Sequence, residues 1–227
     1  MADLASGDLQ VPVPTCPDWT LADLIEHTGF VHRWQTTAVR DAPDDFPDPS
    51  TWRHGPTPGT SLADWFRAGV DAAVDAISGI DPDEPRWTWA GPGTAAWYSR
   101  RITQETLVHR IDAELAAGVE PEPVDPALAV DGVDEMCDVF LPAAVGQPIG
   151  GSGETLHLHA TDVEGEWLLT MHADRVDATR GHAKGDAAIR GTARDLLLMI
   201  WGRDPLGAVD TFGDAAVIDL FRAVARS

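Results

Sequence analysis

Apolar residues recur with the period of an α-helix over the first two-thirds of the chain and alternate with polar residues over part of the last third. Thr20 precedes the first apolar stripe, and Asp23 follows three residues later, which is the spacing of a capping box. Gly118 suits the C-terminal end of the third stripe. The stripes predict four helices, over residues 21–39, 61–80, 96–117 and 126–144.

Two segments between these helices show no period. Residues 40–59, "RDAPDDFPDPSTWRHGPTPG", contain five prolines and many acids, and residues 81–96 read "DPDEPRWTWAGPGTAA". We expect both to be loops, and a loop as long as the first is often functional or mobile.

The pattern changes after the glycine-rich stretch "GQPIGGSG". Alternation predicts strands in "ETLHLHATD", "GEWLLTMHA" and "AAIRG", and helical spacing returns in "TARDLLLMIWGR" and "GDAAVIDLFRAVAR". Because helices come first and a strand-plus-helix unit follows, the sequence predicts an α+β protein with a helical bundle over residues 1–147 and a small α+β domain over residues 152–227.

Charge and cysteine content narrow the class of protein. The 227 residues carry a net charge of −21, so nucleic acid and anionic membrane surfaces are not expected partners. Cys16 and Cys137 form no metal-binding or disulfide motif, and no apolar run is long enough for a membrane span. We therefore expect a soluble, cytoplasmic protein.

Glu105 and His109 lie four residues apart on the third predicted helix, and hence on one face. The same stripe contains Ile102 and Val108, so this face is expected to look inward. A buried carboxylate is costly unless it is paired or bound to a metal. The two residues are therefore either an ordinary salt-bridged pair or two ligands of one cation.

A metal site needs a third ligand, and His27 is the best candidate because it lies on the apolar stripe of the first helix. His32, five residues further, points elsewhere. Two histidines and one carboxylate form a familiar ligand set for zinc and also for non-haem iron. Asp112 could orient the His109 imidazole as an outer partner, or could pair with Arg110 or Arg101.

His157 and His159 share one face of a predicted strand. No acidic residue close in the sequence completes a ligand set with them, so we expect this pair to be structural or exposed.

Two segments resemble a known family. "VPTCPDWTLADLIEHTGFVHRW" and "GPGTAAWYSRRITQETLVHRIDAELAAG" are similar to two signatures of the mycothiol-dependent maleylpyruvate isomerase family, and the C-terminal segments resemble its second domain. The resemblance implies a DinB-like four-helix bundle followed by a small sterol-carrier-like α+β domain. It also implies a divalent metal, usually zinc, on His27, Glu105 and His109.

The family's chemistry implies the thiol mycothiol as cosubstrate and a small electrophile as substrate. The reaction is then an isomerisation or an S-transfer. Two rivals stay open: a metal-dependent hydrolase that uses the same site, and a non-enzymatic protein that binds a small ligand.

The chain departs from the family pattern in two respects. Only "MADLASGDLQVPVP" stands before the "TCPDW" stretch, so the first bundle helix is expected to be short or absent. Two explanations stay open: a chain that starts late, or a partner, for example in a homodimer, that covers the bundle edge. The resemblance also implies an arginine of the C-terminal domain on the substrate carboxylate. Arg203 and Arg222 are candidates here, but no motif fixes the choice, and neither is assigned.

Overall fold

The structure, a computed structural model, describes residues 1–42, 48, 55–143, 148–203 and 208–225. It confirms the α+β class, because it combines helices with a five-stranded sheet. Contacts divide the chain into two units, Met1–Glu122 and Pro123–Ser227, and each is considered by itself. Most of the predicted loop 40–59 falls outside the described residues.

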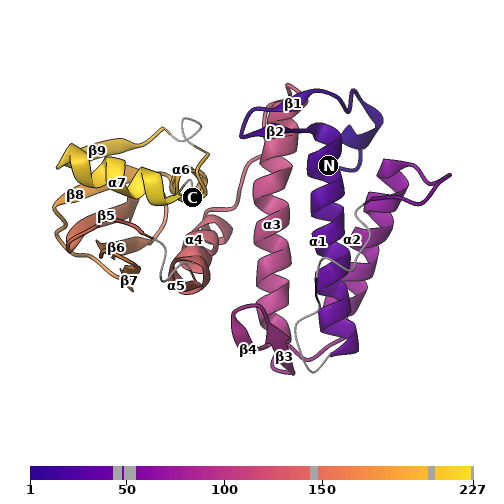
Figure 1. Ribbon diagram of the computed structural model, residues 1–227, viewed down its shortest axis with the longest axis horizontal. Coiled ribbons are helices and arrows are strands. Elements are labelled where there is room, and N and C mark those ends of the chain that lie inside the picture. Colours follow the sequence, from indigo (N-terminus) through magenta and orange to yellow (C-terminus); the bar gives the residue numbers. More distant parts are fainter. Residues whose placement is uncertain (43–47, 49–54, 144–147, 204–207, 226–227) are drawn as a thin grey trace. The chain divides into compact units, whose positions relative to one another are not determined.

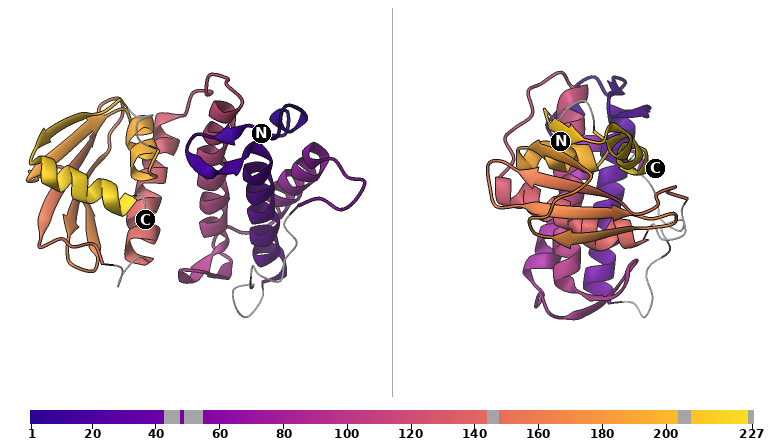
Figure 2. Two further views of the ribbon diagram at one scale, coloured as in Figure 1. Left: turned by 45° about the horizontal axis from the view of Figure 1, so that its top comes forward. Right: turned by 90° about the vertical axis from the view of Figure 1, so that its left-hand side faces the viewer.

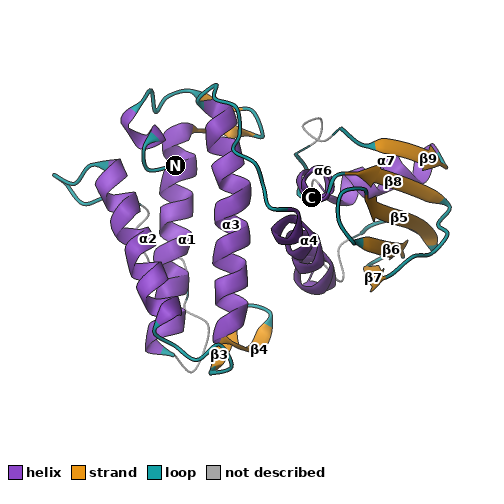
Figure 3. Ribbon diagram, turned by 180° about the vertical axis from the view of Figure 1, so that it is seen from behind, coloured by secondary structure: helices purple, strands orange, loops and turns teal. Residues whose placement is uncertain are grey.

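Three long helices build the N-terminal unit (Figures 1 and 3): α1 (Leu21–Asp41), α2 (Leu62–Ser78) and α3 (Ala95–Ala116). The capping box of Thr20 and Asp23 opens α1 as predicted, and Ser61 caps α2. Gly118 follows α3 with a φ of +69°, the left-handed conformation that glycine favours. The helix α1 packs against both α2 and α3, so one of its faces contacts α2 and another contacts α3.

Short hairpins cover the two ends of this unit (Figure 1). The segment before α1 forms a 3₁₀ turn, η1 (Leu4–Ser6), and a hairpin of β1 (Pro12–Val13) and β2 (Cys16–Thr20). At the other end, β3 (Pro85–Thr88) pairs with β4 (Gly91–Thr94).

The prediction of a loop over residues 81–96 was therefore wrong in part. The β3–β4 hairpin depends on backbone pairing and on a tight turn in which the Thr88 hydroxyl donates to the carbonyl oxygen of Gly91. Proline and glycine occupy several of its positions, so it has no apolar alternation that a sequence pattern could show.

The C-terminal unit contains a sheet in the order β7-β6-β5-β8-β9, in which only β5 and β8 are parallel neighbours. Two helices, α6 (Ala193–Ile200) and α7 (Ala215–Ala225), pack against β5 and β8 (Figure 2). The strands are β5 (Glu154–Ala160), β6 (Glu166–Met171), β7 (Val176–Arg180), β8 (Ala187–Gly191) and β9 (Asp210–Gly213).

The sequence predicted β5, β6 and β8 but missed β7 and β9, which form the two edges of the sheet. Only Val176 is buried in β7, and every residue of β9 is exposed. An edge strand with so few buried side chains does not need the apolar alternation that identifies a central strand.

The predicted fourth helix, residues 126–144, is interrupted. It consists of α4 (Pro126–Glu135), a π-helical turn, η3 (Met136–Phe140), and α5 (Leu141–Ala143). The N–H of Leu141 donates to the carbonyl oxygen of Met136, five residues back. The next residue, Pro142, has no N–H to continue an α-helical ladder, which explains the change of pitch.

The division by contacts places α4 in the C-terminal unit, where Trp167 Nε1 donates to Asp134 Oδ1 at 2.7 Å. This division falls earlier in the chain than the sequence-based boundary between residues 147 and 152, which stays a prediction.

Within the described parts of the chain, no helix combines the length and the apolar character that a membrane span requires. Cys16 is half-buried and Cys137 is buried.

The close approach of α1 and α2 at Gly29 gives a stability prediction. A Cβ atom there would lie 2.3 Å from the buried Trp65 ring. We expect Gly29→Ala to lower the free energy of unfolding in urea by about 1–3 kcal/mol, because the buried Trp65 ring, which has the Arg33 guanidinium against its face, would have to shift.

Gly79→Ala, at the C-terminal end of α2, is the control. Its Cβ would approach only backbone oxygens of α2, the nearest being that of Asp75 at 3.2 Å, and no side chain of α1. The change there should stay within about 1 kcal/mol. Equal losses in the two variants would contradict this view of the α1–α2 contact.

Candidate metal centre

Three side chains from two helices meet inside the N-terminal unit. His27 comes from α1, and Glu105 and His109 come from α3. Glu105 Oε1 lies 3.0 Å from His27 Nε2 and 3.3 Å from His109 Nε2. One ligand atom from each residue falls within 4.8 Å of the others. The structure thus brings together the three residues that the sequence selected.

Asp112 and Thr15 fix the orientation of His109. The Nδ1 atom of His109 lies 2.9 Å from Asp112 Oδ2, and the Thr15 hydroxyl donates to the other carboxylate oxygen at 2.6 Å. Nδ1 faces the Asp112 carboxylate and Nε2 faces Glu105, so both nitrogens of His109 can donate a proton in the absence of a metal. If a metal took Nε2, Asp112 would hold the remaining proton on Nδ1. Among the alternatives for Asp112, the geometry favours the His109 partnership.

The other charged residues near Asp112 have different partners. Arg101 donates to Glu105 Oε2 at 3.1 Å, and Arg110 binds both oxygens of Glu114 at 2.9 Å. Arg101 therefore holds the Glu105 oxygen that lies away from the two histidines and fixes the carboxylate plane.

Burial and the neighbouring charges shift the pKa values of Glu105 and His109 in opposite directions. Burial by itself raises the pKa of Glu105, but the hydrogen bonds from His109 and His27 and the positive charges of His109 and Arg101 lower it well below the usual value. Burial lowers the pKa of His109, but its hydrogen bonds to Asp112 and Glu105 outweigh this effect and raise the pKa to about 9. Glu105 is therefore ionised at neutral pH.

The site has one open side. Side-chain exposure is 34% for His27, against 15% for Glu105 and 11% for His109. The ring of Trp19, in β2, lies 4.8 Å from the His27 ring and 6.1 Å from the His109 ring, measured between centroids. His27 is therefore the most accessible of the three ligand candidates, and a small molecule would approach on its side of the site, beside Trp19.

The residues present fit a divalent transition metal. Zinc binds histidine nitrogen and carboxylate oxygen at about 2.0–2.2 Å, so two ligand atoms of a tetrahedral site are about 3.3–3.5 Å apart. The separations of 3.0 and 3.3 Å around Glu105 Oε1 are close to this spacing. Three protein ligands leave one coordination position for a substrate or water.

His32 points away from the centre, as its position on the helix predicted. It is buried, and its Nε2 atom lies 2.7 Å from the Thr106 hydroxyl. Burial lowers its pKa to about 4, so His32 is neutral at physiological pH and acts as a core residue.

The sequence did not reveal three features of the site: the Thr15 hydroxyl on Asp112, the Trp19 ring beside the imidazoles, and the Arg101–Glu105 ion pair. Thr15 and Trp19 belong to the segment before α1, whose hairpin folds back over the helix ends. Trp19 lies in the same signature as His27, and this shared position could have indicated that Trp19 lies near the site. Arg101 lies four residues before Glu105, the spacing of a helical ion pair.

The expectation that no acid completes a set with His157 and His159 was wrong. Glu166 of β6 lies 3.1 Å from His157 and 3.0 Å from His159, and His182 approaches the same carboxylate. Cross-strand pairing brings Glu166 to these histidines, and the sequence spacing gave no sign of it.

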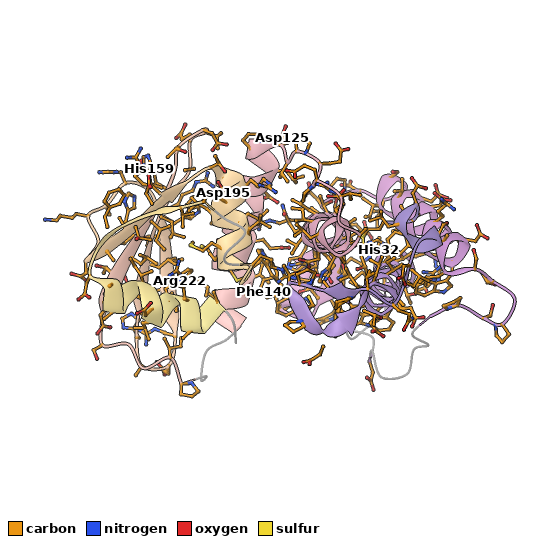
Figure 4. All side chains as sticks on the ribbon, turned by 90° about the horizontal axis from the view of Figure 1, so that it is seen from above. His32, Asp125, Phe140, His159, Asp195 and Arg222 are labelled. Carbon is orange, nitrogen blue, oxygen red and sulfur yellow. The ribbon has the colours of Figure 1, made fainter. Side chains whose placement is uncertain are left out.

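Arg203 and Arg222, the candidates for a substrate carboxylate, both lie in the C-terminal unit (Figure 4 labels Arg222). Arg222 belongs to the last turn of α7, and Arg203 follows α6.

The fold and the centre define an α+β protein with a helical, histidine- and glutamate-lined candidate site in its first unit. Residues 1–114 match the family described as the mycothiol maleylpyruvate isomerase N-terminal domain, and residues 127–220 match the MDMPI C-terminal domain. The chain belongs to the mycothiol maleylpyruvate isomerase family, which is a family of enzymes. Comparison with curated protein sequences gives no match.

Solved structures show the same fold. The crystal structure of a mycothiol-dependent maleylpyruvate isomerase is 14% identical to this chain, with a TM-score of 0.57, and a point mutant of that enzyme is 13% identical, with a TM-score of 0.58. Each alignment covers 92% of this chain and 86% of the other. A UbiJ-SCP2 ubiquinone synthesis protein is 21% identical over 46% of this chain and 93% of its own, but its TM-score of 0.33 supports no argument.

The raised pKa of His109 gives a pH prediction for the metal-free protein. The folded pKa, about 9, exceeds the ordinary value of 6.5, so the imidazolium contributes its full stability below pH 6.5 and loses it as the pH rises through about 9. Relative to His109→Gln, the free energy of unfolding in EDTA should fall by about 1–3 kcal/mol across that window. A difference that is constant or grows with pH would show that His109 is not a protonated partner of the two carboxylates.

Proposed function

We propose that this chain is a metal-dependent enzyme that uses mycothiol, or a similar low-molecular-weight thiol, to attack a small electrophile, as an isomerase or an S-transferase. The observation that carries the proposal is the meeting of His27, Glu105 and His109 at one point in a chain of this family. Zinc is the metal that this ligand set suits best.

A divalent ion bound by these three residues would supply a positive charge that lowers the pKa of a thiol and favours the thiolate. The residues of the chain prepare the site for this. Asp112 holds the proton of His109 on Nδ1 and leaves Nε2 to act as a ligand. Arg101 holds one oxygen of Glu105, so the other faces the two imidazoles.

Two outcomes follow from attack of a thiolate on an activated C=C bond. If the adduct rotates about the former double bond and then expels the thiol, the net reaction is an isomerisation and the thiol is unchanged. If the adduct takes up a proton and leaves, the net reaction is an S-transfer. Maleylpyruvate, the substrate of the structural relatives by their names, is the first electrophile to test.

A compartment can be proposed on the same basis. The sequence contains no disulfide motif, and a low-molecular-weight thiol stays reduced only in a reducing environment. We place the activity in the cytoplasm.

Removal of a ligand tests the function. We expect tag-free His109→Ala and Glu105→Gln to lose thiol-dependent turnover of maleylpyruvate by at least about 100-fold, because each removes a donor to the metal. In Glu114→Gln, the matched control, the altered carboxylate pairs with Arg110 on the same helix and does not touch the centre, so its rate should be retained.

The same assay separates the rival functions. Cleavage of simple esters or amides without thiol, lost in His109→Ala, would establish a hydrolase instead. Unchanged turnover in both ligand variants would contradict a role for this centre.

Because protons compete for the imidazoles, metal should be lost as the pH falls through the histidine range.

Asp112 gives a second prediction. Asp112→Asn removes the charge that holds the His109 proton on Nδ1, so we expect the affinity for zinc at this centre to fall by about 10–100-fold. Competition with a metal-chelating dye measures the affinity, and Glu114→Gln again serves as the control. An unchanged affinity would show that Asp112 does not orient the ligand.

A further inference from the structure

A second group of metal-binding side chains lies on the sheet of the C-terminal unit. We call it the sheet cluster: His157, His159, Glu166 and His182. No residue of this group takes part in the proposed thiol chemistry, and all four belong to one unit.

Strand pairing places three of the four on one face of the sheet. His159 of β5 lies directly opposite Glu166 of β6, and His157, two residues before His159, shares the same face. The alternate residues of β5, Leu156 and Leu158, are fully buried on the other face. In Figure 4, His159 and Arg222 of α7 are seen on opposite sides of the sheet.

The turn after β7 brings the fourth residue back over this face. The N–H of Gly181 donates to the carbonyl oxygen of Glu166 at 2.8 Å. The φ of Gly181 is +127°, a conformation that other residues rarely adopt, and the chain reverses there. His182 Nδ1 then lies 2.6 Å from Glu166 Oε2.

Three imidazoles therefore surround one carboxylate. Glu166 Oε2 lies 3.1 Å from His157 Nε2, and Glu166 Oε1 lies 3.0 Å from His159 Nδ1. One ligand atom from each of the four residues falls within 4.8 Å of all the others. The rings of His157 and His182 are nearly perpendicular, at 89°, with centroids 5.2 Å apart, so they do not stack but converge by their edges.

The alternative is a network of hydrogen bonds without a metal. In such a network the carboxylate accepts up to about four hydrogen bonds, and one arginine would supply two of them with a fixed charge. The chain has 16 lysines and arginines, and Arg190 lies on the same face of β8, in register with His159. Three imidazoles on one carboxylate are instead the donor set of a transition metal.

Burial also favours a bound ion. The side chains of His157, Glu166 and His159 are 9%, 24% and 31% exposed, so they form a partly enclosed base, whereas His182 is 79% exposed. An ion could enter from the solvent side and be closed in by His182 as the fourth ligand.

We propose that the sheet cluster binds a divalent transition-metal ion, with three histidine nitrogens and one carboxylate oxygen as ligands. Four protein ligands complete a tetrahedral zinc site, which is typical of structural rather than catalytic metals. The ion would tie the turn after β7 to β5 and β6. Copper and nickel suit the same donors, and zinc serves as the probe.

Metal counting tests the proposal. The full-length, tag-free protein is stripped of metal and then dialysed against about 1 μM buffered free zinc, at which a site of micromolar affinity is half filled and a tighter one is full. We expect two ions per chain in the wild type and one in the double variant His159→Ala/His182→Ala. His172→Ala, the control, should retain two, because His172 pairs with Asp177 in the same unit outside the cluster.

A second site-directed variant separates this proposal from the proposed function. His109→Ala should keep one ion, bound by the sheet cluster. If the wild type binds one ion and His109→Ala binds none, the sheet cluster is not a metal site. The centre formed by His27, Glu105 and His109, called here the first centre, then binds the ion. If wild type and His109→Ala each bind one, and the double variant binds none, the sheet cluster stands and the first centre fails.

Hydrogen exchange gives a second test that does not depend on the number of zinc ions bound per chain. Zinc should slow amide exchange over residues 181–186 in the wild type and in His109→Ala, because the turn becomes anchored to the sheet. His182→Ala, an exposed substitution that leaves the strands intact, should lose this effect. Equal protection by zinc in His182→Ala would overturn the proposal.

Discussion

A buried carboxylate between two helices is the constraint on which the N-terminal unit depends. Glu105 is ionised although it is largely removed from water, and it is stabilised only because His27, His109 and Arg101 all face it. An unpaired charge in that position would cost several kcal/mol. The carboxylate therefore ties α1 to α3 and requires the two helices to keep one register, and the same requirement gathers three side chains of the kinds that bind metals at one point.

The surroundings serve this arrangement. The β1–β2 hairpin supplies Thr15, which holds Asp112, and Trp19, which covers the two imidazoles. On its other side α1 packs closely on α2 through Gly29. The helix that carries His27 is thus fixed from both sides, and a centre built on rigid helices can keep the separations that a metal requires. The chain's membership of the mycothiol maleylpyruvate isomerase family is the basis on which we propose a thiol-activating role for this centre.

The helical part of the fold and the three central residues were predictable from the sequence because both follow a single period. Thr20 and Asp23 mark the start of α1, and the apolar stripes place His27, Glu105 and His109 on inward faces. No such period marks the elements that the sequence missed: the β3–β4 hairpin, the edge strands β7 and β9, and the π-helical turn at Met136. The sheet cluster was missed for a related reason: Glu166 and His182 reach His157 through strand register and a glycine turn, which a linear spacing does not encode.

Anomalous diffraction at the zinc edge, from crystals of the tag-free protein grown with zinc, tests the central claim most directly, because it locates the ion without reference to activity. A peak at about 2.0–2.2 Å from His27 Nε2, a Glu105 oxygen and His109 Nε2 is the predicted result. A fully occupied zinc elsewhere in the N-terminal unit, or density in which His27 is turned away from Glu105 and no ion lies between them, would contradict it.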